Sequence, residues 1–152
     1  MILNEVLNTP VKFKWLHNEA GMAMARFMIG NDEVNVEFHE MENPLNSKEA
    51  DPTAPKLCID ISFNVSENGD YDSAEYGITG NGGEYQIFAT VVLITKEFIS
   101  THKPDGICFS AAEPSRIKLY DRFVKRFTGM GYKLWKRARH SSKDMFWVLV
   151  KK

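Results

Sequence analysis

Residues 77–132 read GITGNGGEYQIFATVVLITKEFISTHKPDGICFSAAEPSRIKLYDRFVKRFTGMGY, and this stretch decides the fold class. Within it, Ile87, Val91 and Ile94 recur at helical spacing and predict a buried helix over 84–102. The β-branched content of 87–94 also suits a buried strand, so the helix is the favoured of two interpretations. Pro104 ends the segment in either case.

The residues before this helix are tolerant of unusual backbone angles: Gly80, Asn81, Gly82 and Gly83. Backbone N–H groups at a helix N-terminus lie at the positive end of the helix dipole, where a phosphate binds well. The same cluster also suits a simple turn that starts a helix. The residues alone leave both interpretations open.

A second helix is predicted over 116–128, with Ser115 as its N-cap. Its apolar side consists of residues at spacings of three and four, namely Ile117, Tyr120, Phe123, Val124 and Phe127. Short strands are predicted at 106–110, 132–135 and 145–150, the last two joined by a polar hairpin over 136–144. Strands and helices thus alternate in the second half of the chain.

The first 65 residues predict an antiparallel meander. Apolar and polar residues alternate at 11–15 and 34–38, and 22–29 is read as a further strand between two turns. Residues 40–55 are polar, contain three prolines and predict an exposed loop. Alternation returns at 56–65 and predicts a central strand, with the residues from Leu57 to Val65 at odd positions on its apolar face and Asp60 on the other. We expect one domain over residues 1–152.

The net charge of −1 hides a division along the chain. Residues 1–113 hold seven Lys and Arg against eighteen Asp and Glu, whereas residues 114–152 hold twelve against two. This asymmetry indicates either a surface for anions or a solvated basic face neutralised by the rest of the protein. A nucleic acid would contact the basic residues Arg122, Lys125, Arg126, Lys136 and Arg137, with Trp135 available for stacking.

Other classes of protein are not indicated. The longest apolar run, 87–94, is shorter than the roughly 18 residues that a membrane span needs, and the first residues do not resemble a secretory signal. Cys58 and Cys108 lie in apolar runs, which predicts buried reduced thiols and a cytoplasmic protein. The histidines show no metal-ligand spacing, and the acids of 70–75 lack the remaining pattern of a calcium loop.

The order of glycine turn, helix, strand and second helix, with Leu119-Tyr120 in the second helix and Gly131-Tyr132 after it, resembles the GNAT superfamily of acyl-CoA-dependent N-acetyltransferases. The resemblance covers about residues 56–150 and implies an α+β fold, a central, mostly antiparallel mixed sheet flanked by two main helices. Thr-Gly-x-Gly before Phe-Ala-Thr-Val, followed by Glu-Pro-Ser-Arg-x-Lys-Leu-Tyr, also resembles small uncharacterised proteins of tailed bacteriophages. For such a protein the host cytoplasm is the expected location.

The GNAT resemblance implies acetyl-CoA as cofactor, with its phosphates held by backbone N–H groups of Gly80, Asn81, Gly82 and Gly83. It implies that the phenol of Tyr120 protonates the departing thiolate. On the residues alone, a tyrosine on the apolar face of a helix, such as Tyr120, is more often a core residue. Arg116 stands where the family has a small residue, and either crowds the cofactor channel or contacts a phosphate. Asp60 is the positional candidate for the general base.

The chain also departs from the family pattern. Gly77 stands where the family loop has Arg or Gln, and a polar excursion separates Val65 from the glycines. Three functions therefore remain open: an N-acetyltransferase with an unknown acceptor amine, a non-catalytic GNAT-like scaffold that binds a host or phage protein, and a nucleic-acid-binding protein.

Overall fold

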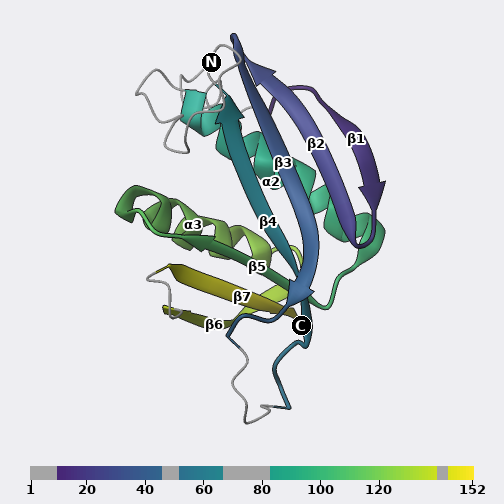
Figure 1. Ribbon diagram of the computed structural model, residues 1–152, viewed down its shortest axis with the longest axis vertical. Helices are drawn as coiled ribbons and strands as arrows, with labels where there is room; N and C mark the ends of the chain where they lie inside the picture. The colour runs from purple at the N-terminus through teal and green to yellow at the C-terminus, as the bar shows by residue number, and fades with distance from the viewer. Residues whose placement is uncertain (1–9, 46–51, 67–82, 140–143) are drawn as a thin grey trace. The chain divides into compact units, whose positions relative to one another are not determined.

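The computed structural model describes residues 10–45, 52–66, 83–139 and 144–152 (Figure 1). The elements follow in the order β1 (Phe13–Glu19), β2 (Met22–Ile29), β3 (Asp32–Glu42), β4 (Leu57–Ser66), α2 (Gly83–His102), β5 (Gly106–Ala111), α3 (Pro114–Thr128), β6 (Tyr132–Arg139) and β7 (Met145–Lys151). The strands form one seven-stranded sheet in the order β1-β2-β3-β4-β5-β7-β6. Its pairs are mostly antiparallel, and β4 and β5 run parallel. The predicted α+β class, the mixed sheet, the two helices and the central place of β4 are confirmed.

Two compact units divide the chain: Met1–Glu37 with Phe63–Thr101, and Phe38–Ser62 with His102–Lys152. Strands β3 and β4 contribute residues to both units.

The first unit is built on the antiparallel pair of β1 and β2, whose register shifts between Trp15 and His17. Ala23, Ala25 and Phe27 of β2 are buried, while Met22 and Met28 are exposed, as the alternation of the strand requires. The tight turn into β3 contains Gly30 at φ +60°, in the left-handed region that glycine adopts without strain.

Helix α2 buries an apolar face in the same unit. Val91, Ile94 and Phe98, three or four residues apart, are at most 1% exposed, so the predicted stripe is the buried face. Thr90 is buried too: its hydroxyl donates to the carbonyl of Gln86 at 2.7 Å and accepts the N–H of Val11 at 3.0 Å. The helical interpretation of 84–102 is confirmed, because its apolar residues follow the helical period over the whole segment.

The second unit packs α3 on its strands. β5 pairs with β7 along its whole length, from Gly106 with Val150 to Ala111 with Met145, and β7 pairs in turn with β6. Phe109 of β5 contacts the rings of Tyr120, Phe123 and Phe127 of α3 at centroid distances of 5.1, 6.0 and 5.8 Å. Burial of a large apolar side chain contributes about 1.5–3 kcal/mol, so this aromatic cluster is the main attachment of α3.

The predicted N-cap of α3 is wrong. Glu113, not Ser115, occupies the N-cap position, and its side chain makes no capping hydrogen bond. Pro114 is the first helical residue, where its fixed φ suits a helix and its missing N–H costs nothing. The helix therefore begins two residues earlier than predicted.

Strands β1, β3 and β6 also differ from the prediction in their bounds. β1 begins at Phe13 and runs to Glu19, beyond the predicted 11–15. β3 continues to Glu42, so the predicted loop over 40–55 starts later, and within it Asn43 and Pro55 are buried. Asn43 is held by hydrogen bonds to the carbonyls of Lys56 and Pro55 at 3.0 and 2.9 Å.

β6 also extends through Arg139 and takes up part of the predicted hairpin over 136–144. In the extensions of β3 and β6, pairing with a neighbouring strand brings a polar segment into the sheet. Leu57, placed on the apolar face of the central strand, is 50% exposed because it is the first residue of that strand.

Candidate functional site

The parallel pair of β4 and β5 is the centre of the candidate site. In the part of the chain that the structure describes, their ladder consists of Ile59 with Ile107 and Asp60 with Cys108. Both strands continue past these pairs, β4 to Ser66 and β5 to Ala111. From Phe109 onward, the side of β5 that faces β4 is therefore not part of this ladder. An edge of this kind presents backbone N–H and C=O groups in the pattern that an extended chain pairs with.

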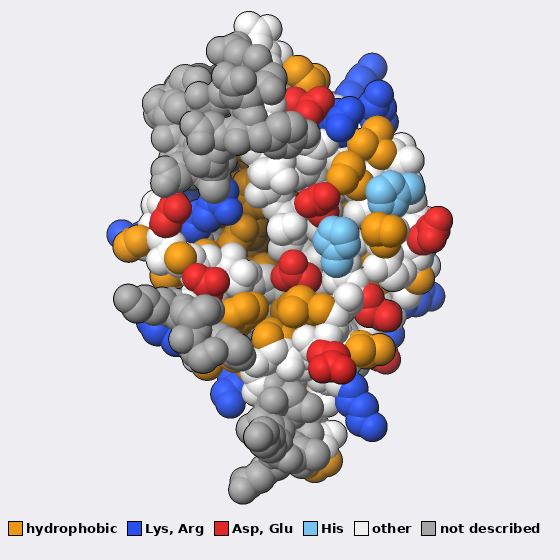
Figure 2. Space-filling model, in the orientation of Figure 1, with side chains coloured by type: hydrophobic (Ala, Val, Ile, Leu, Met, Phe, Trp, Pro, Cys, Tyr) orange, Lys and Arg blue, Asp and Glu red, His pale blue; other side chains and the backbone are white. Residues whose placement is uncertain are grey.

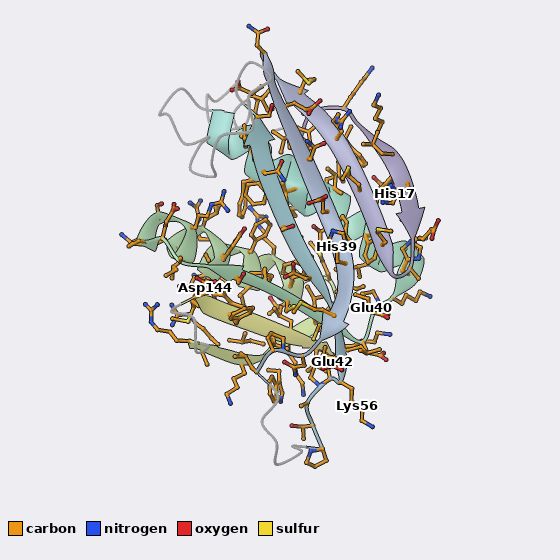
Figure 3. The ribbon with its side chains drawn as sticks, viewed as in Figure 1. His17, His39, Glu40, Glu42, Lys56 and Asp144 are labelled. Atoms are coloured by element: carbon orange, nitrogen blue, oxygen red, sulfur yellow. The ribbon has the colours of Figure 1, made fainter. Side chains whose placement is uncertain are left out.

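Asp60 lies at the last pair of this ladder and is half-buried. Its Oδ1 lies 3.8 Å from Sγ of Cys108. Burial raises the pKa of the Asp60 carboxyl, while the hydrogen bond from Cys108 and the charge of His39 act in the opposite direction. His39 is exposed on β3, where Figure 3 labels it together with Glu40 and Glu42. Asp60 was proposed from its position alone. Its burial is a setting in which a carboxyl keeps its proton to a higher pH than an exposed carboxyl does.

Tyr120 is 3% exposed on α3. Its ring meets Phe109 edge-on at 5.1 Å and Trp147 at 5.6 Å. The side chain is thus part of the aromatic core, as one of the two interpretations of the sequence expected. Its contact residue Phe109 is also the first residue of β5 beyond the ladder with β4. The core position therefore places the phenol ring beside the point at which the described ladder of β4 and β5 ends.

The predicted phosphate-binding residues are only partly described. Gly80, Asn81 and Gly82 lie outside the described residues, and Gly83 is the first residue of α2. Arg116 lies in the first turn of α3, half-buried, in a turn that has no acidic residue. The cofactor contacts expected from the sequence therefore stay predictions.

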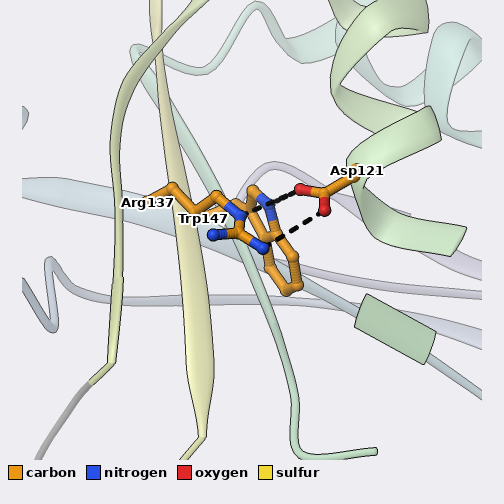
Figure 4. Close-up of polar contacts among 3 residues, drawn as sticks. All are labelled: Asp121, Arg137 and Trp147. Carbon is orange, nitrogen blue, oxygen red and sulfur yellow. Dashed lines mark hydrogen bonds and ion pairs between the residues drawn. The ribbon is translucent and has the colours of Figure 1, made fainter. Parts of the chain in front are cut away.

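The basic residues proposed for nucleic acid divide into two groups. Arg122, Lys125 and Arg126 on α3 and Lys136 on β6 are exposed. Arg137 instead forms an ion pair with Asp121, through Nε to Oδ1 at 3.0 Å and a second guanidinium nitrogen to Oδ2 at 3.2 Å (Figure 4). Arg137 thus connects β6 to α3 within the protein.

On the face shown in Figure 2, Lys and Arg side chains lie mainly at the margins.

A cluster that the sequence did not predict lies around the two cysteines. Cys58 and Cys108 are 2% and 0% exposed and free, which confirms the prediction of buried thiols. The hydrogen bond with Cys58, followed by burial, raises the pKa of Cys108 above its usual range. Met41 places its sulfur 3.6 Å from Cys108. The sequence offered one signal for this cluster: Cys58 and Asp60 are two residues apart and so lie on the same face of the predicted central strand. The pairing register of β5 against β4 leaves no signature in the local sequence, so the contact with Cys108 was not predicted.

An open depression of about 640 Å³ lies in the first unit. It is lined by the segment 11–14, by Arg26 to Met28 of β2 and by Glu33. Arg26 there is held by Asn35 at 2.9 Å and by Glu33 at 3.2 Å. Of the residues predicted for catalysis or cofactor binding that the structure describes, none lines this depression.

Across the described ranges, no three or more His, Cys, Asp or Glu side chains are arranged to hold a metal ion. Neither of the two described helices is at once long and apolar enough to cross a membrane.

The chain belongs to DUF6934, a family of unknown function, whose family model matches residues 35–133. The match includes β4, β5 and α3, and so the parallel pair and Tyr120. No curated protein matches the chain.

Proposed function

We propose that the protein is a GNAT-like N-acyltransferase that moves an acyl group from acyl-CoA to an amine. The observation that carries this proposal is the parallel pair of β4 and β5, whose ladder ends at Asp60 and Cys108 while both strands continue. The element order also supports it, because β4, α2, β5, α3 and two closing strands follow one another as the resemblance implies.

The open end of the pair suits the chemistry of the donor. The pantetheine arm of CoA is an extended chain with amide groups, and it can pair with the edge of β5 from Phe109 onward as an added strand would. As the resemblance implies, backbone N–H groups of Gly80 to Gly83 would hold the cofactor phosphates. An acyl thioester on such an arm would lie close to the end of the ladder.

Two side chains of the second unit are assigned to the reaction. Asp60 accepts the proton of the attacking amine, whose nitrogen forms a bond to the thioester carbonyl carbon. Bound acyl-CoA would supply the thioester, whose carbon–sulfur bond would break as the new carbon–nitrogen bond forms, so that the CoA thiolate would leave. The phenol of Tyr120 donates the proton that makes it a thiol. An amide and free CoA are the products, and atoms and charges balance.

Calorimetry with acetyl-CoA on the full chain tests the proposal. We expect a dissociation constant on the order of micromolar, which corresponds to about −8 kcal/mol. Gly82→Asp places a carboxylate in the predicted phosphate loop and should weaken binding at least tenfold. Gly21→Asp is the matched control, because a Cβ at Gly21 meets no atom within 4 Å. No detectable binding by the unaltered protein would refute the transferase and leave the non-catalytic scaffold.

The role of Tyr120 needs its own test. Tyr120→Phe keeps the ring that packs on Phe109 and Trp147 and removes only the hydroxyl. Transfer to an amine acceptor found by screening should then slow about 10²-fold or more, while acetyl-CoA still binds. Unchanged turnover in this variant would assign Tyr120 to the core alone.

A second candidate, nucleic-acid binding, is favoured by the charge of α3. Its only acidic residue, Asp121, is engaged by Arg137 and Trp147, while Arg122, Lys125 and Arg126 are exposed. Binding of a single-stranded oligonucleotide should weaken steeply between about 50 and about 200 mM salt. Lys125→Glu should weaken it further, and Lys14→Glu on exposed β1 is the control. Salt-independent binding, or equal effects of both variants, would refute this candidate.

A further inference from the structure

Three sulfur atoms meet in the second unit, contributed by β3, β4 and β5. Cys108 is at the centre: its Sγ lies 3.6 Å from Sδ of Met41, and Cys58 lies in the same buried cluster. Val148, also fully buried, belongs to the same cluster, and Leu45 and Trp135 pack against it. These neighbours are apolar, and the half-buried carboxyl of Asp60 also borders the cluster, with Oδ1 3.8 Å from Sγ of Cys108.

We propose that Cys58, Cys108 and Met41 form a binding site for one soft monovalent metal ion of the copper(I) and silver(I) class. Two thiolates and a thioether are ligands that such ions prefer to oxygen or nitrogen donors. The donor set lacks the four ligands of a structural zinc site. Its third member is a methionine, whose thioether is a ligand for soft ions.

The distances suit a shared ion. Two sulfurs that bind one ion at about 2.3 Å are separated by roughly 3.8–4.0 Å. The 3.6 Å between Cys108 and Met41 is short of this by a few tenths of an ångström, a change that rotation of the flexible methionine side chain provides. Met41 is half-buried and is thus the member of the set closest to solvent, from which the ion enters.

Binding also balances in protons. Each thiol releases its proton when its sulfur binds the ion, since the thiolate is the metal ligand. One monovalent ion therefore displaces two protons, and the thioether of Met41 displaces none. No oxidant or reductant takes part, and the oxidation state of the ion is unchanged.

Competition for copper(I) against the chelator bicinchoninate, on the full chain without oxygen, tests the site. We expect one copper(I) per chain. Met41→Leu, which keeps the volume and removes the sulfur, should weaken binding at least tenfold. Met28→Leu is the matched control, because Met28 is 49% exposed on β2 and lies in the other unit. Its affinity should equal that of the unaltered protein.

Substitution of the thiols completes the test. Cys58→Ser and Cys108→Ser should each abolish one-to-one binding, and circular dichroism establishes whether each variant is folded. If neither serine variant folds, the comparison of Met41→Leu with Met28→Leu still tests whether the ion binds at this site. Equal affinities of those two variants, retention of binding in a folded serine variant, or absence of copper(I) binding by the unaltered protein would each overturn the proposal.

Discussion

The indole N–H of Trp147 donates a hydrogen bond of 2.8 Å to Oδ1 of Asp121 (Figure 4). Asp121 also receives the guanidinium of Arg137, which lies 5.6 Å from the centre of the Trp147 ring. One carboxylate thus joins α3 to β6 and β7. Because Trp147 is fully buried, its N–H depends on this partner, whereas the ion pair is partly exposed.

Replacing Asp121 separates the two interactions. Asp121→Ala leaves the buried indole N–H without a protein acceptor and should lower the free energy of unfolding by about 1–3 kcal/mol. Asp121→Asn keeps an oxygen for Trp147 and loses the ion pair, which at this exposure is worth about 0–1 kcal/mol. Urea denaturation measures both. Equal losses in the two variants would show that the ion pair, and not the indole, is the interaction that matters.

The burial of Tyr132 predicts that the protein loses stability at high pH. Its hydroxyl donates to the carbonyl of Pro104, and burial, with a smaller effect of Asp105, raises the pKa of Tyr132 from 10 to about 12. The folded state therefore holds the phenolic proton more tightly than the unfolded state. The resulting stability is fully present below about pH 10 and is lost as the pH rises toward about 12.

Tyr132→Phe checks that prediction. We expect it to destabilise the protein by about 1 kcal/mol at neutral pH, because one hydrogen bond is lost. Its stability should fall less than that of the unaltered protein between about pH 10 and about pH 12. Chemical denaturation across this range measures the difference. Parallel curves for the two proteins would contradict the assigned pKa.

Gly106 predicts strong intolerance of a side chain. A Cβ there would lie 2.8 Å from Cβ of Pro55, 2.9 Å from the carbonyl oxygen of Leu57 and 3.0 Å from Sγ of Cys58. Gly106→Ala should therefore destabilise by about 1–3 kcal/mol, the usual cost of overpacking. Gly21→Ala, with no atom within 4 Å of its Cβ, is the control and should change stability by less than about 1 kcal/mol. Similar thermal unfolding of the two variants would refute this packing.

The uncapped start of α3 predicts a stabilising substitution. Glu113 at the N-cap makes no side-chain hydrogen bond to the helix. Glu113→Asp keeps the negative charge and shortens the side chain to one that caps well, so it should stabilise the protein by about 0.5–1 kcal/mol. Ser115→Ala, inside the first turn, should have little effect. A larger loss from Ser115→Ala than gain from Glu113→Asp would restore Ser115 as the capping residue.

Local pattern predicted the elements whose residues repeat with a clear period. The stripe of Val91, Ile94 and Phe98 identified α2, and the alternation from Ile59 to Val65 identified β4, since each period follows from one element's own geometry. Ends of elements were less predictable. Glu42 and Arg139 are polar, yet they are the last residues of strands, because a paired neighbour supplies the backbone hydrogen bonds.

The candidate site was predictable only in part. Asp60 and Tyr120 were found by position, and the structure places them at the last pair of the parallel ladder and beside Phe109, respectively. The glycine residues 80–82 lie outside the described residues, so their role stays a prediction. The contact of Cys108 with Met41 joins residues that are 67 positions apart, and no short-range pattern predicts such a contact.

By itself the sequence determined the α+β class, the order of the elements and the burial of both cysteines, because hydrophobic periodicity is a property of each segment alone. Only the tertiary structure decided that β4 and β5 pair as far as Asp60 and Cys108, that Met41 adjoins the thiols, and that Asp121 serves both Trp147 and Arg137. Those relationships depend on strand order and register. Both are set when distant segments pack together and a shift of one residue would expose a buried face.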